Sequence, residues 1–140
     1  LPTVGASETL YYRNKLNYGF SDKSIVYDDN FNNKMRYVTE TGAGFHVARD
    51  FERILDIKNC HLQAEPSNAI RNFIKAFLID NNITVHNVRR HEGWFRDMVV
   101  RMTSKGHLMV IIAYYFEDEN GQKLMDALLK AFPQIDSLYY

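Results

Sequence analysis

The residues of this chain that could do chemistry are one cysteine, five histidines and several arginines and lysines placed among aromatic residues. A free cysteine is either a buried small hydrophobic side chain or a metal ligand, and an iron–sulfur cluster usually takes four thiolates. Cys60 is the only cysteine, so the chain by itself supplies one of those four. The residues alone favour a buried free thiol and leave the ligand role open.

The cationic residues also have two interpretations. An arginine beside a stacking aromatic is suited to contact phosphates and unpaired bases, whereas exposed cations beside sheet-packing aromatics are ordinary in any domain. Seventeen basic and seventeen acidic residues cancel, so net charge does not indicate a strongly cationic nucleic-acid module, although a local patch is compatible with it. The candidate contact residues are Arg13, Lys15, Arg49, Arg96 and Arg101, which lie among Tyr12, Tyr18, Phe45, Trp94 and Phe95.

Catalytic motifs are missing from the sequence. It contains no nucleophile elbow, no glycine-rich phosphate loop and no Cys-x-x-Cys pair, and its histidines show no metal-ligand spacing. We therefore expect no catalytic residue within these 140 positions.

The elements that must position these residues begin with a strand over residues 12–20. Its alternation places Arg13 and Lys15 side by side on the polar face. Residues 21–33 are rich in Asp and Asn, and because they lack the glycine and terminal Glu of an EF-hand, they predict a solvated loop rather than a calcium site. Residues 35–38 predict an edge strand.

The middle of the chain predicts a flexible turn at residues 41–44 and a strand at 51–57, with Cys60 following the strand. A helix then begins near Pro66, which suits a first helical position. Its apolar residues recur with helical spacing, and Arg71 falls on the opposite, polar side. The apolar positions are Ile70, Phe73, Ile74, Phe77 and Leu78.

The remaining residues predict a short strand at 83–88, a hairpin of strands 94–103 and 107–116, a helix at 119–132 capped by Asp118, and a final strand at 135–140. The second hairpin strand is almost wholly apolar, which is typical of a central strand covered on both faces. Together the elements predict an α+β fold, an antiparallel β-sheet with two helices packed on one face.

Length and composition fit a single domain over residues 1–140. No apolar run is long enough to span a membrane, and the single cysteine suits a reducing compartment, so we expect a soluble, cytoplasmic domain. The chain begins Leu1-Pro2 without methionine and stops on an apolar run, from which we expect a piece excised from a longer protein.

Six motifs occur in order along the chain: YRNK at 12–15, GFH at 44–46, LDIKNCHLQ at 55–63, SNAIRN at 67–72, HEGWFRDMVVR at 91–101 and FPQIDSLYY at 132–140. Together they resemble the central region of the SAM-dependent RNA (uracil-5-)-methyltransferases of the RumA/TrmA type, most closely the 23S rRNA branch. The resemblance covers nearly the whole chain, from about residue 8 to residue 140.

The resemblance implies that the TRAM domain and the SAM-binding catalytic domain lie in the missing parts of the same protein. The full-length protein would transfer a methyl group from SAM to C5 of uridine, in 23S rRNA or in tRNA, and this fragment would help to bind RNA without being catalytic. Cys60 matches the fourth ligand of the [4Fe–4S] cluster that some members carry. The five cationic residues above become candidate RNA-binding residues. The alternative is a module that contacts the missing domains and no RNA.

Overall fold

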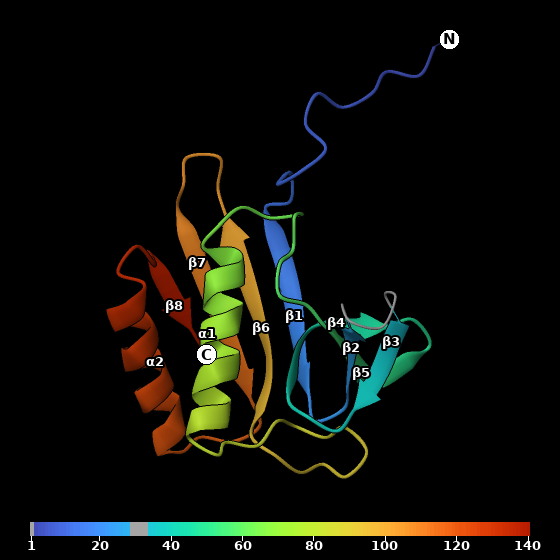
Figure 1. The fold of residues 1–140 in the computed structure, drawn as a ribbon. Coiled ribbons are helices and arrows are strands. Elements are labelled where there is room, and N and C mark those ends of the chain that lie inside the picture. Colours follow the sequence, from blue (N-terminus) through green and yellow to red (C-terminus); the bar gives the residue numbers. More distant parts are fainter. Residues whose placement is uncertain (1, 29–33) are drawn as a thin grey trace.

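The computed structural model describes residues 2–28 and 34–140, which form one β-sheet and two α-helices (Figure 1). In chain order the elements are β1 (Lys15–Ser21), β2 (Ser24–Asp28), β3 (Lys34–Val38), β4 (Gly42–Val47), β5 (Asp50–Asp56), α1 (Ser67–Asp80), β6 (Phe95–Met102), β7 (Leu108–Tyr114), α2 (Glu119–Ala131) and β8 (Ser137–Tyr139).

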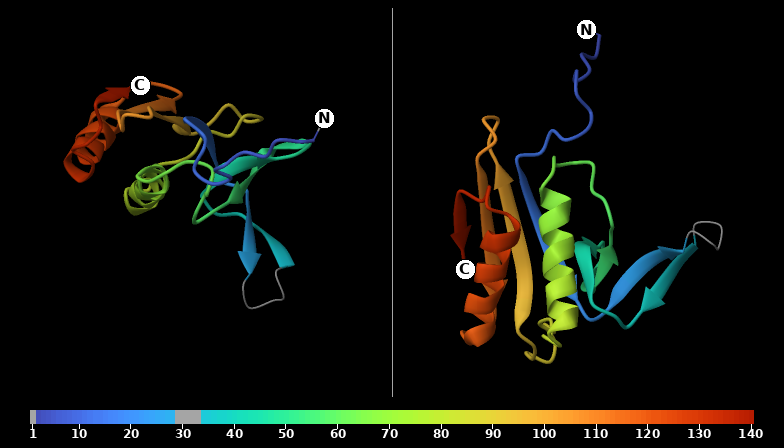
Figure 2. Two further views of the ribbon diagram at one scale, coloured as in Figure 1. Left: turned by 90° about the horizontal axis from the view of Figure 1, so that it is seen from above. Right: turned by 60° about the vertical axis from the view of Figure 1, so that its left-hand side comes forward.

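The sheet has eight strands in the order β3-β2-β5-β4-β1-β6-β7-β8. Neighbouring strands are antiparallel except for the pairs β2–β5 and β7–β8, which are parallel. Both helices lie on the same side of the sheet, as the view from above shows (Figure 2). The predicted fold class is therefore confirmed, with two parallel pairings added to an otherwise antiparallel sheet.

The core lies between the two helices and the strands behind them. From α1, Ile70, Ile74 and Leu78 are fully buried, and from α2, Leu124 and Leu128 are fully buried. Each of these side chains contributes roughly 1.5–3 kcal/mol through burial. The predicted cap of α2 is confirmed, because the Asp118 carboxylate accepts a hydrogen bond from the Asn120 N–H at 2.9 Å.

Strand β1 starts later than the alternation predicts. Lys15 and Asn17 are exposed, whereas Leu16, Tyr18 and Phe20 are buried, so the pattern is right from Lys15 onward. Before Lys15 the prediction is wrong. The Arg13 N–H donates to the carbonyl of Leu62 at 2.8 Å, so this segment follows the loop after Cys60 rather than the sheet.

Three other boundaries differ from expectation. Part of the predicted loop at 21–33 is strand β2, which pairs with β3, while residues 29–33 lie outside the described residues. The predicted turn at 41–44 is mostly strand β4, where a side chain on Gly44 would lie 2.0 Å from the Leu55 carbonyl oxygen. Between residues 83 and 88, Val85 and Asn87 form isolated bridges instead of a strand.

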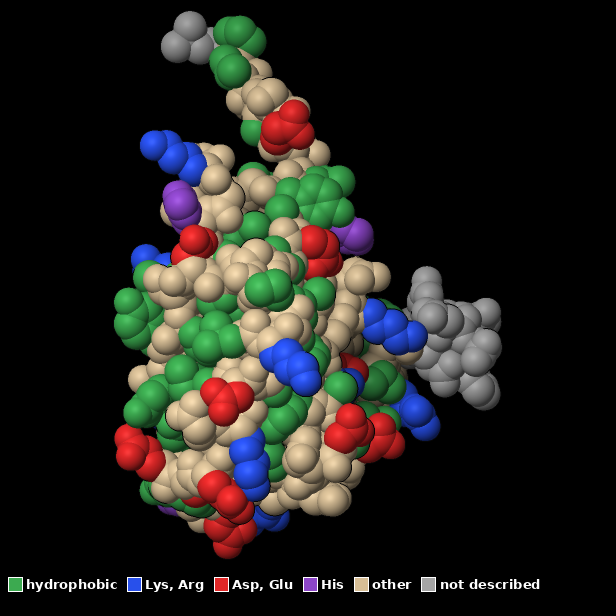
Figure 3. Space-filling view, turned by 90° about the vertical axis from the view of Figure 1, so that its left-hand side faces the viewer, with side chains coloured by type: hydrophobic (Ala, Val, Ile, Leu, Met, Phe, Trp, Pro, Cys, Tyr) green, Lys and Arg blue, Asp and Glu red, His purple; other side chains and the backbone are tan. Residues whose placement is uncertain are grey.

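The predicted edge strand is confirmed as β3, and β8 forms the other edge. Side chains of several kinds are mixed over the side of the molecule that carries α2 (Figure 3). Within the described residues, neither helix has the length and apolar character that crossing a membrane requires.

Candidate nucleic-acid interface

The face of the sheet opposite the helices presents its side chains in three rows, because directly paired residues of a β-ladder project on the same side. We call this surface the open face. The rows are Lys15, Arg101, Met109 and Ser137; then Asn17, Val99, Ile111 and Tyr139; then Gly19, Asp97 and Ala113. Each row crosses β1, β6 and β7, and the first two continue onto β8.

The first row places two cations directly opposite each other. Lys15 of β1 and Arg101 of β6 are register partners, and both are exposed. Among residues 2–28 and 34–140, neither has a carboxylate within ion-pair distance. Like charges directly opposite in a sheet repel each other, so an anion placed between them would relieve the repulsion.

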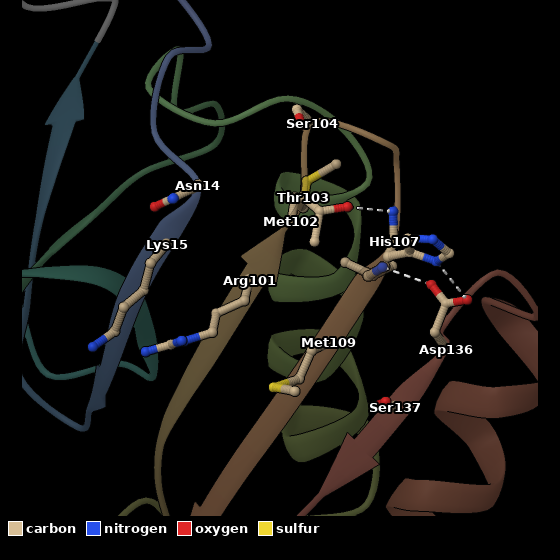
Figure 4. Close-up of a pocket in the computed structure, with 11 residues that line it drawn as sticks. Asn14, Lys15, Arg101, Met102, Thr103, Ser104, His107, Met109, Asp136 and Ser137 are labelled. Atoms are coloured by element: carbon tan, nitrogen blue, oxygen red, sulfur yellow. Dashed lines mark hydrogen bonds and ion pairs between the residues drawn. The ribbon is translucent and has the colours of Figure 1, made fainter.

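The pair borders an open cavity of about 800 Å³ at the hairpin end of the sheet (Figure 4). In the close-up, the Lys15 and Arg101 side chains come from neighbouring strands and extend in the same direction, away from Asp136 and Ser137. The lining also includes hydroxyl and amide groups, which can hydrogen-bond to a ligand, beside the apolar side chains of two methionines and a leucine. The lining residues are Asn14, Lys15, Arg101, Met102, Thr103, Ser104, His107, Leu108, Met109, Asp136 and Ser137.

One carboxylate lies on the far side of this cavity. Asp136 accepts a hydrogen bond from the Leu108 N–H at 2.7 Å and lies 3.4 Å from Nδ1 of His107. These contacts, the backbone hydrogen bond first, lower the pKa of Asp136 below its ordinary value. The ionised carboxylate would repel an anion, which leaves the Lys15–Arg101 side as the anion-binding part of the cavity.

The other predicted contact residues are not brought to this pair. Arg13 precedes β1, and Arg49 occupies the turn between β4 and β5 with a positive φ of 66°. Arg96 lies at the opposite end of β6 from Arg101, beside Asp97 at 3.8 Å. The five cations therefore do not form one patch. The structure brings Lys15 and Arg101 together and leaves the other three elsewhere.

Most of the aromatic residues expected beside the cations pack inside the protein. Tyr18, Phe95 and Trp94 are at most 2% exposed, and the Trp94 Nε1–H donates to the Phe116 carbonyl at 2.9 Å. For these residues the sheet-packing interpretation is right. Among the residues of the three rows, Tyr139 is the aromatic one, and it is 53% exposed. Tyr139 is not among the contact residues predicted from the sequence, although the alternation of the final strand could have indicated its exposure.

Cys60 is buried next to Arg71, which the helical pattern predicts on the polar side of α1. That placement of Arg71 is wrong, because its side chain is fully buried. Asn68 connects the two residues: its Oδ1 accepts from the Cys60 N–H at 2.7 Å and from Arg71 Nη1 at 2.9 Å. Arg71 also donates to the Lys58 carbonyl at 2.6 Å, and its guanidinium lies 5.0 Å from the centre of the Tyr18 ring.

Burial lowers the pKa of Arg71, and the acidic groups of Tyr18 and Cys60 act in the opposite direction. Its Nε has no hydrogen-bond partner among the described residues. The cation at this position is therefore only partly satisfied. In the part of the chain that the structure describes, no three His, Cys, Asp or Glu side chains gather as a metal site.

Comparisons with known proteins give sequence relatives and a structural neighbour, while no protein-family model matches the chain. An uncharacterized RNA methyltransferase of Bacteroides thetaiotaomicron is 34% identical over 99% of this chain. One of Porphyromonas gingivalis is 36% identical, also over 99% of this chain. The chain spans 32% and 31% of the lengths of these two relatives.

One structural neighbour is the crystal structure of Pyrococcus abyssi tRNA (uracil-54, C5)-methyltransferase in complex with S-adenosyl-L-homocysteine. It superposes with a TM-score of 0.56 at 22% sequence identity, over 80% of this chain and 24% of that chain. At this identity the likeness establishes a shared fold.

Proposed function

We propose that this chain is the RNA-contacting central domain of a longer SAM-dependent RNA (uracil-5-)-methyltransferase that methylates C5 of uridine in 23S rRNA. The names of the relatives support RNA methylation, and the name of the structural neighbour, a tRNA (uracil-54, C5)-methyltransferase, supports uracil C5 as the target atom. The 23S rRNA target rests on the sequence resemblance, and tRNA is the competing substrate. The 140 residues bind and orient RNA, while the catalytic residues belong to the rest of the longer protein.

The observation that carries the RNA role is the Lys15–Arg101 pair on the open face. Arginine and lysine side chains bind phosphate oxygens in protein–nucleic acid complexes, and such contacts position the nucleic acid. Here two exposed cations share one row, border a cavity and, among the described residues, have no carboxylate partner. Arg13, Arg49 and Arg96 stay candidates for weaker contacts at other positions.

SAM supplies the methyl group when it is bound, and we assign its site to the part of the protein outside this chain.

We also propose that Cys60 supplies one thiolate to a [4Fe–4S] cluster in the longer protein. Its surroundings fit an anionic group, because Arg71 is fully buried nearby and its Nε is unpaired among the described residues. The other ligands would come from outside the chain.

The experiment for the RNA role measures methyl transfer and RNA binding by the longer protein. Labelled SAM is offered with 23S rRNA and with tRNA, and Lys15→Ala plus Arg101→Ala is compared with wild type. Lys123→Ala is the matched control, since Lys123 is a surface cation on α2 that pairs with Glu119 at 3.0 Å. We expect the double variant to bind RNA more weakly and the control to be unchanged. Absence of methyl transfer to either RNA would contradict the proposal.

The experiment for the cluster measures iron. Cys60→Ser in the longer protein should lower its iron content and its visible absorption, whereas unchanged iron would remove Cys60 from the ligand set.

A second function is favoured by one observation, namely the half-exposed apolar side chains of Val99, Met109 and Ile111 on the open face. Such a surface also suits contact with another domain of the longer protein. In that case the chain would be a structural module that touches no RNA, and the double variant above would bind RNA as tightly as wild type.

A further inference from the structure

We propose that the open face holds one unpaired nucleotide, with its phosphate between Lys15 and Arg101 and its base on the second row, against Val99, Ile111 and Tyr139. This inference rests on the proposed RNA function and adds to it a defined site and a preference for single-stranded RNA. It follows from the register of four neighbouring strands rather than from overall charge.

The phosphate position follows from the pairing of Lys15 with Arg101. Directly opposed residues in an antiparallel ladder have Cα atoms roughly 4.5–5.5 Å apart. Side chains anchored so close, and extending in the same direction (Figure 4), can converge on a single phosphate. Charge-assisted hydrogen bonds of this kind are roughly twice as strong as neutral ones.

The base position follows from the adjoining row. Asn17, Val99, Ile111 and Tyr139 are consecutive register partners across β1, β6, β7 and β8. Val99 and Ile111 are half-buried, Tyr139 is 53% exposed, and Asn17 is exposed at the opposite end of the row. An apolar surface ending in an aromatic ring suits the face of a base.

The side chains of Tyr139 and Tyr140 lie on opposite sides of the sheet, because successive side chains alternate along a strand. Tyr140 stacks on Tyr114, with ring centres 5.5 Å apart, whereas Tyr139 pairs with Ile111 on the open face. Tyr139 is therefore free to stack on a ligand, while its neighbour is already stacked within the protein.

The third row limits the site at its other end. Asp97 is half-buried, and burial raises its pKa above the ordinary value, against the effects of Arg96 and His46. A carboxylate here repels a second phosphate, and Gly19 offers no side chain for contact. The cationic end of the face is thus the phosphate end.

The preference for unpaired RNA has a geometric reason. Bases in a duplex are stacked on their neighbours, so their faces cannot reach a sheet surface, whereas unstacked bases can lie on aromatic side chains. A duplex could still contact Lys15 and Arg101 through its backbone, but it would leave the second row unused.

The test compares a single-stranded oligouridine with an RNA duplex of equal total charge, using fluorescence anisotropy at fixed salt. Tyr139→Leu retains apolar area and removes the aromatic ring, and Tyr139→Phe retains the ring. Tyr27→Ala is the matched control, because Tyr27 on β2 is also 53% exposed. We expect Tyr139→Leu to weaken single-strand binding about tenfold or more, in line with the usual contribution of base stacking. Tyr139→Phe, the control, and duplex binding by every Tyr139 variant should stay near wild type.

The outcomes separate the two proposals. Equal loss for duplex and single strand, or no loss with Tyr139→Leu, would overturn the nucleotide site while Lys15 and Arg101 could still support RNA binding. Loss of association between the chain and the rest of the protein, without change in RNA affinity, would instead assign the open face to a protein contact. If wild type bound neither RNA, the proposed function itself would fail.

Discussion

Lys15 and Arg101 face each other across β1 and β6, so two exposed positive charges occupy directly opposed positions of one antiparallel ladder. This arrangement costs stability in the free protein, because like charges in opposed positions repel each other. Because this charge pair is repulsive and borders a cavity, an anionic ligand bound there would relieve the repulsion.

Arg101→Glu should therefore change stability and RNA binding in opposite directions. The substitution converts repulsion with Lys15 into attraction, so the free energy of unfolding should rise by about 0.2–1 kcal/mol at low salt. RNA affinity should fall, since a phosphate contact is lost and a repulsive charge is added. Urea denaturation and anisotropy on the same samples measure both quantities. A fall in both together would indicate that Arg101 has a structural role instead.

The salt dependence of binding should distinguish the pair from the other cations. The slope of log K against log salt is negative, and removing one phosphate contact decreases its magnitude by about 0.7 for a single strand. We expect that decrease for Lys15→Ala and Arg101→Ala. Arg49→Ala and Arg96→Ala should change the slope less, because Arg49 lies in the turn between β4 and β5 and Arg96 lies beside Asp97. An equal decrease for all four variants would mean that RNA contacts a wider surface than the open face.

Asn68→Ala should destabilise the protein by about 1–3 kcal/mol, which is the usual cost of leaving buried polar groups unpaired. The Asn68 side chain accepts from both Cys60 and Arg71 and also donates to the Cys60 carbonyl at 3.1 Å. Asn72→Ala is the control, because Asn72 also accepts from Arg71, at 3.0 Å, but is exposed. Thermal unfolding compares them, and equal effects would show that the buried network around Arg71 does not depend on Asn68.

The contribution of Asp136 to stability should disappear in acid. The folded protein holds the pKa of Asp136 below its ordinary value of 3.8, mainly through the Leu108 N–H. A lowered folded-state pKa means that ionised Asp136 stabilises the fold above about pH 3.8 and that this stabilisation is lost as pH falls through the folded-state pKa. Asp136→Asn should thus be less stable than wild type near pH 7, and the two should converge in strong acid. Melting temperatures between pH 7 and pH 2 follow the difference, and a constant gap would contradict this account.

Much of the fold could be predicted because its main elements carry strong local patterns. The i, i+3, i+4 spacing of Ile70, Ile74 and Leu78 predicts α1, and the strand alternation of Leu16, Tyr18 and Phe20 predicts the buried side of β1. These patterns arise because each element must bury one side. Apolar residues therefore recur with the period of the element, about 3.6 in a helix and 2 in a strand, and identify the buried side.

The predictions that failed depended on neighbours distant in sequence. Arg71 lies on the polar side of an isolated helix, yet the chain around Lys58 and Cys60 folds over it and buries it. The apolar run of β7 predicts a strand covered on both faces, but β7 lies next to the edge strand and its second side is half-exposed. Which part of a helix or strand is covered depends on what the rest of the chain places against it.

The amino-acid sequence by itself determined the α+β class, the two helices, the hairpin at residues 104–106 and the candidate cations, because each is encoded by residues close together in the chain. Only the tertiary structure decided which cations meet. Lys15 and Arg101 lie far apart in the sequence, and the register of β1 against β6 is what brings them together, with Tyr139 two strands further along the adjoining row. Register depends on how the hydrophobic patterns of two strands match when one face of the sheet is buried, so the local pattern of one strand does not identify its partner residues on a strand distant in the sequence.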